Sequence, residues 1–136
     1  MGAWGMGIFQ DDSAADFLGE LCEAEDPLSL MKGAFVSASA AEYLEYDPAH
    51  QVLVSAAALD GLLNGTQYGS GEELDAWVER NRGLNVAPLK GPAVAAVRRV
   101  LADGSELNEL WLENAKDYPT WRAGVELIAG RLETKS

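Results

Sequence analysis

The sequence predicts an all-α fold, a compact single-domain bundle of six or seven short helices with an N-terminal glycine and aromatic arm. Apolar residues recur at spacings of three and four along most of the chain, which is the period of an amphipathic helix. No two alternating runs flank a hairpin turn, so no strand is predicted. At 136 residues, 48% of them hydrophobic, the chain is the size of one domain, 1–136, with enough apolar surface for one core.

An acid precedes each of the first three predicted helices. Asp11 or Asp12 can cap the first helix, which ends near Glu25. Asp26-Pro27 and Asp47-Pro48 each place a capping acid before a proline, and proline suits the first helical position. The residues expected to face the core are Ala14, Phe17, Leu18, Leu21 and Cys22 in the first helix, Leu28, Met31, Phe35 and Ala38 in the second, and Val52, Ala56, Leu59 and Leu63 in the third, which ends at Asn64-Gly65.

The second half of the chain is predicted to hold the remaining helices. Ser70 and Glu73 match a reciprocal capping box ahead of a fourth helix. A fifth helix is predicted over 88–102, a short sixth helix after Ser105, and a last helix opened by Asp117-Tyr118-Pro119. The apolar residues expected inside are Leu74, Trp77 and Val78, then Val94, Val97 and Leu101, then Leu107, Leu110 and Trp111, and finally Trp121, Val125, Ile128 and Leu132, which form the clearest stripe.

The arm, residues 1–10, combines three glycines with large apolar side chains. The glycines allow a close approach to the helices, and Trp4, Ile8 and Phe9 are expected to be buried there as anchors. The glycine order is Gly-x-x-Gly-x-Gly, whereas a dinucleotide-binding loop reads Gly-x-Gly-x-x-Gly after a strand. Asp11 and Asp12 also occupy the helix N-terminus that a phosphate would need, so nucleotide binding is disfavoured.

The net charge of -12 is distributed unevenly. Residues 1–68 hold eleven acids and one base, Lys32, whereas residues 69–136 hold eleven acids and nine bases, which gives nets of -10 and -2. Such a field repels nucleic acid and anionic membranes. The acidic half is interpreted either as a face that keeps the protein soluble or as a docking surface that steers a basic protein partner.

Apolar runs, the N-terminal residues and cysteine content together predict a cytoplasmic location. No run of about 18 apolar residues is present, and the N-terminus lacks a basic region leading into an apolar one, so neither a membrane span nor a secretory signal is predicted. Cys22 is the only cysteine, and its apolar neighbours predict a buried thiol in a reducing compartment.

Three carboxylates form the first candidate site. Asp12, Asp16 and Glu20 fall at steps of four, so a helix places them on one face, where like charges repel. Three kinds of compensation are open: backbone N–H groups of the arm together with an arginine from the second half, a hard cation such as Mg²⁺ or Ca²⁺, or screening by solvent and salt. The first is favoured because a metal normally needs ligands from more than one element, so no metal or cofactor is expected.

A second candidate site involves aromatic residues. Tyr43 and Tyr46, with Tyr68, form a candidate binding patch, because tyrosine offers a large amphipathic contact area at low entropic cost. The alternative is ordinary half-buried tyrosines at helix ends. His50 follows Asp47 by three residues, but no nucleophile is placed beside this pair, so His50 is predicted to be a surface histidine.

Several of these motifs together resemble a known family. The run from Gly2 to Phe9, followed by Asp12, Ala15, Asp16 and Phe17, resembles the N-terminal signature of a bacterial family catalogued as domain of unknown function 4259. Several residues of the second half are similar to the C-terminal half of that family. They are Trp77, Asn81, Ser105 to Leu107, Trp111 and Trp121-Arg122. The resemblance implies a compact cytoplasmic domain.

Two classes of function follow from these features. The favoured hypothesis is a non-catalytic protein whose acidic N-terminal half binds a basic protein partner. In its most concrete form, this chain is an accessory or toxin-neutralising protein that masks the basic partner. Its binding residues would be Asp12, Asp16, Glu20, Tyr43 and Tyr46. The alternative is a small hydrolase, metal-dependent enzyme or metal-binding protein that uses the three carboxylates.

Overall fold

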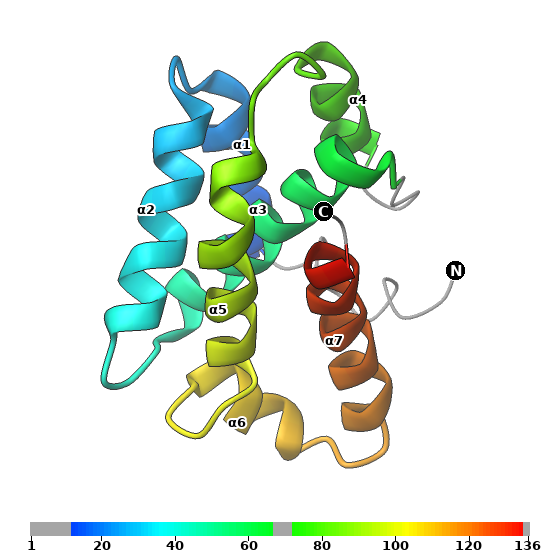
Figure 1. Ribbon diagram of the computed structural model, residues 1–136. Coiled ribbons are helices and arrows are strands. Elements are labelled where there is room, and N and C mark those ends of the chain that lie inside the picture. The colour runs from blue at the N-terminus through cyan, green and yellow to red at the C-terminus, as the bar shows by residue number, and fades with distance from the viewer. Residues whose placement is uncertain (1–11, 67–71, 135–136) are drawn as a thin grey trace.

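The computed structural model describes residues 12–66 and 72–134 of the chain, and these residues form helices and no strand (Figure 1). The helices are α1 (Asp12–Glu23), α2 (Pro27–Ala40), α3 (Tyr46–Asn64), α4 (Glu72–Arg80), the 3₁₀ helix η2 (Ala87–Leu89), α5 (Lys90–Val100), α6 (Glu106–Leu112) and α7 (Tyr118–Thr134). The predicted all-α class is therefore confirmed, and the seven α-helices of the described residues agree with the predicted six or seven. The arm with Trp4, Ile8 and Phe9, as well as Tyr68, lies outside the described residues.

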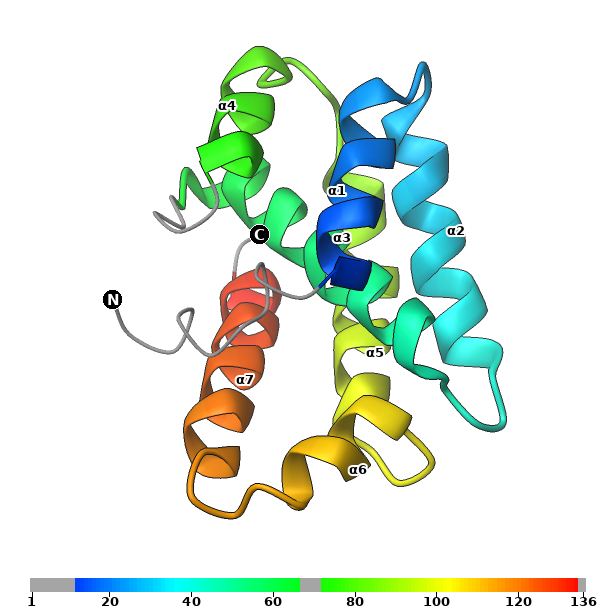
Figure 2. The ribbon, with the colours of Figure 1, turned by 180° about the vertical axis from the view of Figure 1, so that it is seen from behind.

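Helix α3 is the centre of the fold. It contacts α1, α2, α5 and α7, and every residue from Val52 to Gly61 is buried. Figure 1 shows α5 in front of α3, and Figure 2 shows α1 in front of it from the opposite side. The helix is therefore covered on two opposite faces, which explains why its sequence is apolar nearly all round.

The predicted stripes supply most of the core. In α7 the residues Trp121, Val125, Ile128 and Leu132 are all buried, and Trp121 stacks on the half-buried Trp111 of α6 with ring centroids 5.5 Å apart. The predicted interior positions that are instead half-buried or exposed are Cys22, Leu28, Leu63, Val94, Leu101, Leu110 and Trp111. Most of these lie near helix ends, where fewer neighbouring helices cover a side chain.

The predicted cap at Asp26 and the predicted helix end at Asn64-Gly65 are confirmed in atomic detail. The Asp26 side chain accepts hydrogen bonds from the Ser29 backbone N–H at 3.2 Å and from its hydroxyl at 2.7 Å, and these bonds lower the pKa of Asp26. Ser105 accepts from the Asn108 N–H at 3.4 Å at the start of α6. At the end of α3, Gly65 adopts a φ of 74°, a left-handed conformation that glycine takes without steric cost.

The prediction that Asp47 caps the third helix is wrong by two residues. Helix α3 begins at Tyr46, and its N-cap is Glu45, whose side chain makes no capping hydrogen bond. The Tyr46 backbone N–H instead donates to a carboxylate oxygen of Glu106 at 3.0 Å. An acid sixty residues away thus satisfies one of the N–H groups at the start of the helix.

None of the described helices combines the length and the apolar character needed to cross a membrane.

Candidate functional site

The three carboxylates of α1 point outward. Asp12, Asp16 and Glu20 are all exposed, whereas Phe17 and Leu21 of the same helix are buried. None of the three forms an ion pair with another described residue, so an arginine partner from the second half is not found in this part of the chain. Backbone donors from the arm lie outside the described residues.

A metal site is not apparent in the described ranges. Across residues 12–66 and 72–134, no group of three or more His, Cys, Asp or Glu side chains is positioned to hold a metal ion. The outward face of α1 therefore offers carboxylates from one element without converging ligands from a second one.

The start of α1 lies beside the start of α3. The Ser13 hydroxyl donates a hydrogen bond to the Asp47 carboxylate in the first turn of α3. Asp12 and Asp16 therefore share one end of the molecule with Asp47 and with the exposed N-cap residue Glu45.

The Tyr43 and Tyr46 side chains behave differently from each other. Tyr43 is 47% exposed, and its hydroxyl donates to a Glu109 carboxylate oxygen at 2.9 Å. This hydrogen bond is the main reason why the pKa of Tyr43 is raised, and the nearby Glu106 and Glu45 charges add to it. Tyr46 is half-buried and packs edge-on against His50, with ring centroids 4.7 Å apart. Tyr43 therefore remains the better candidate contact residue.

These contacts join three helix starts into one surface, which we call the acidic edge. Ser13 and Asp47 link α1 to α3, while the Tyr46 N–H and the Tyr43 hydroxyl link the start of α3 to α6. The acidic edge consists of Asp12, Asp16, Glu45, Asp47, Glu106 and Glu109, with Tyr43 among them.

A single arginine fixes the two loops that carry the acidic edge. The Arg99 guanidinium donates to the backbone carbonyls of Ala41, Glu42, Asp103 and Gly104 at 3.1 to 3.4 Å. Beside it, the loops pair through Leu44 N–H to Gly104 O at 2.7 Å and Glu106 N–H to Leu44 O at 2.8 Å. We call this set of contacts the Arg99 junction. It fixes the backbone on either side of Tyr43, because planar guanidinium donors hold several carbonyls at once.

Gly104 fits the Arg99 junction for a steric reason. Its φ is 78°, and a Cβ built at this position would lie 3.3 Å from the Glu42 carbonyl oxygen. A larger residue would therefore be strained and crowded here.

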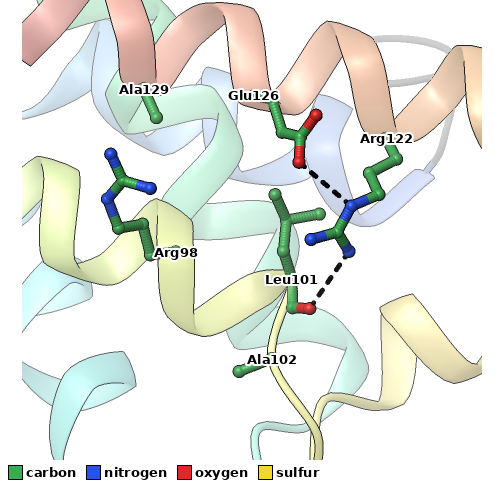
Figure 3. Close-up of a pocket in the computed structure, with 6 residues that line it drawn as sticks. All are labelled: Arg98, Leu101, Ala102, Arg122, Glu126 and Ala129. Atoms are coloured by element: carbon green, nitrogen blue, oxygen red, sulfur yellow. Dashed lines mark hydrogen bonds and ion pairs between the residues drawn. The ribbon is translucent and has the colours of Figure 1, made fainter.

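Three arginines of the second half pair with acids of the same half. Arg82 pairs with Glu79, Arg98 with Glu133, and Arg122 with Glu126 at 3.1 Å. Figure 3 shows the groove between α5 and α7, where Arg122 also donates to the Leu101 carbonyl at 3.3 Å. This groove holds about 380 Å³, but its two arginines are already neutralised by glutamates, so an anionic ligand would have to displace them.

Asp60 is a buried ion that the sequence analysis did not identify. Its carboxylate is fully buried in α3, accepts from Asn64 at 2.6 Å and pairs with Arg131 of α7 at 3.2 Å. The available signal was a lone acid within the otherwise apolar run 52–63. A charge at such a position requires a partner.

Two predictions about reactive side chains are wrong. His50 is 3% exposed and not a surface residue, because it lies on the central helix α3 against Tyr46. Cys22 is half-buried and not enclosed, because it lies at the side of α1 within reach of Glu73 and Arg80. Burial and the Glu73 charge raise the pKa of the Cys22 thiol and outweigh Arg80, so the reactive thiolate is disfavoured.

The family model described as Domain of unknown function (DUF4259) matches residues 2–124. The chain belongs to this family. The matched range contains the acidic edge, Tyr43 and Arg99, whereas Glu126, Arg131 and Glu133 lie beyond it. Neither a curated protein nor a solved structure gave a match.

Proposed function

We propose that this DUF4259 protein binds a basic protein partner through the acidic edge. In its most specific form, the proposal is that this chain acts as an accessory or toxin-neutralising protein that masks a cationic partner. We also propose a cytoplasmic location, since a single cysteine without a disulfide is typical of a reducing compartment.

The observation that carries the proposal is the unequal pairing of charges. Within the described residues, the first-half acids Asp12, Asp16, Glu20, Glu23, Glu25, Asp26, Glu42, Glu45 and Asp47 are exposed and belong to none of the ion pairs. Exposed carboxylates without internal cations produce a negative potential over the surface. Such a potential attracts a cationic protein and accelerates its association.

Tyr43 gives the acidic edge a contact that is not purely electrostatic. Its ring is nearly half exposed, and its position is held by Glu109 and by the adjacent Arg99 junction. A fixed aromatic ring loses little entropy when a partner covers it, which is why tyrosine is frequent at the centre of interfaces. The surface therefore combines long-range attraction with one ordered anchor.

The test is a comparison of two charge-matched variants. Asp12→Asn with Asp16→Asn removes two charges from the acidic edge, and Glu73→Gln with Asp103→Asn removes two exposed charges of the second half outside it. Both should bind the protein that co-purifies from the native host, but the association rate should fall more for the acidic-edge variant at low salt. Equal rates for the two variants, or the absence of any co-purifying basic protein, would refute the proposal.

A further inference from the structure

A second groove lies where α1, α2 and α3 meet, next to the acidic edge. It holds about 380 Å³. Phe17 and Glu20 of α1, Gly33 and Ser37 of α2, and Pro48 and Gln51 of α3 are among the residues that line it. We call it the Glu20 groove.

The lining combines one charge with apolar walls. Glu20 is the only charged residue that lines the groove, while the half-buried Leu30 and Pro48 provide apolar surface. The Ser37 hydroxyl and the Gln51 amide make no side-chain hydrogen bond to another described residue, so their oxygens are available as acceptors. The groove therefore offers a carboxylate and neutral acceptors above a wall that an aliphatic chain can cover.

The charges around the Glu20 groove have the same sign as Glu20. Asp16 lies one turn before Glu20 on α1, and Asp47 directly precedes Pro48. The one lysine of this half, Lys32, is exposed on α2 and, at 3.6 residues per turn, projects to the side of the helix away from Gly33 and Ser37. A cation entering the groove thus meets a negative potential from two helices.

We propose that the Glu20 groove receives an arginine side chain of the basic partner. The inference rests on the proposed function and names the chemistry that one part of the surface recognises. The three methylenes of arginine would cover Leu30 and Pro48, and its guanidinium would donate two parallel hydrogen bonds to the Glu20 carboxylate. The remaining guanidinium donors match the oxygens of Ser37 and Gln51. A lysine ammonium has three donors around a single point and cannot form the forked pair.

The primary test uses a small probe in place of the partner. N-acetyl-arginine amide is titrated into the isotope-labelled full chain at low salt, and backbone amide shifts are followed by NMR. We expect saturable shifts confined to the residues that line the groove and their neighbours, 17–20, 30–37 and 48–51, and weaker binding of N-acetyl-lysine amide. Shifts spread over all acidic surfaces, or equal binding of the two probes, would overturn the proposal.

Three variants locate the binding. Glu20→Gln should weaken the affinity for the arginine probe by about tenfold, as expected for the loss of a charge-assisted pair. Glu23→Gln removes the same charge from the same helix outside the groove and should leave binding unchanged. Gly33→Leu should block the groove while Glu20 is retained, and the helix should tolerate it, because a Cβ at Gly33 has no atom within 4 Å. Retained binding by Gly33→Leu or by Glu20→Gln would contradict the proposal.

The outcome separates this inference from the proposed function. If the wild type captures a basic partner in a salt-dependent manner but the arginine probe does not bind, the proposed role of the Glu20 groove is refuted. The proposed function of the acidic edge is then retained. If the probe binds in the groove but Gly33→Leu leaves partner affinity unchanged, the groove has no part in the complex and the proposal is refuted. Loss of both probe and partner binding in Gly33→Leu, with an unchanged circular dichroism spectrum, is the expected result.

Discussion

Residues 12–66 and residues 72–134 differ in what their charged side chains contact. In the second part, Arg82, Arg98 and Arg122 pair with acids of the same part, and Arg122 also donates to a backbone carbonyl. In the first part, Asp60 is the only acid that forms an ion pair with a described residue, and that pair is directed into the core. Several charges of the second part are thus paired internally, whereas the exposed acids of the first part remain available to solvent or to a partner.

The Asp60 pair gives the largest expected effect. Asp60→Ala should lower the free energy of unfolding by about 3 kcal/mol, at the low end of the range for a broken buried pair because Arg131 is 30% exposed. Urea denaturation measures the loss. Glu126→Gln, which breaks the exposed Arg122 pair, serves as the control and should cost less than about 0.5 kcal/mol. Similar losses in the two variants would remove the distinction between buried and exposed pairs.

The Arg99 junction should have the next largest effect. Arg99→Ala removes the donors to four carbonyls and should cost about 2 kcal/mol, since hydrogen bonds from charged groups are stronger than neutral ones. Hydrogen exchange at the Leu44 and Glu106 amides, which pair across the junction, should accelerate with it. Unchanged exchange there would show that the loops hold each other without the arginine. Arg99→Lys should restore only part of the protection, because it retains the charge but not the fork.

Exposed first-half charges should affect binding far more than stability. Neutralising Glu20, Glu23 and Glu25 together should change the free energy of unfolding by less than about 0.5 kcal/mol. The rate of association with a basic partner should fall and should depend less steeply on salt, because screening shortens the Debye length from about 30 Å at 0.01 M to about 8 Å at 0.15 M. Stopped-flow measurements across salt would detect this. A variant that associates like the wild type would show that these glutamates serve only as a hydrated face.

The smallest expected effect concerns the titration of Tyr43. The pKa of Tyr43 is raised chiefly by the hydrogen bond to Glu109. The stabilisation from this hydrogen bond is therefore fully present below the ordinary tyrosine pKa and is lost as pH rises through the raised pKa of the folded state. Tyrosinate absorbance should show Tyr43 ionising at lower pH in Glu109→Gln than in the wild type. Tyr43→Phe identifies the signal. An unshifted curve in Glu109→Gln would mean that the glutamate does not hold the ring.

Features encoded within one helix were predictable, and features that depend on distant residues were not. The stripe of α7 and the Asp26 cap are local, since their residues lie three or four positions apart. The start of α3 depends on Glu106, which no local pattern indicates. His50 is buried because α3 is covered on opposite faces, and a helical period alone does not reveal a second covered face.

The candidate site follows the same division. The exposed carboxylates of α1 were predictable from their spacing, which places them opposite Phe17 and Leu21. The contribution of Glu106 and Glu109 to the same surface was not, because it requires the pairing of two loops that are about sixty residues apart. The Glu20 groove likewise forms only where three helices meet.

The stacked pair of Trp111 and Trp121 has an optical consequence. Two indole rings 5.5 Å apart and 9° from parallel couple their electronic transitions, which produces a paired signal in circular dichroism that depends on their separation and orientation. Trp111 lies on α6, the helix that carries Glu106 and Glu109, while Trp121 is fixed in the core on α7. The protein therefore contains an intrinsic reporter, without any added label, of whether α6 shifts when the acidic edge is occupied.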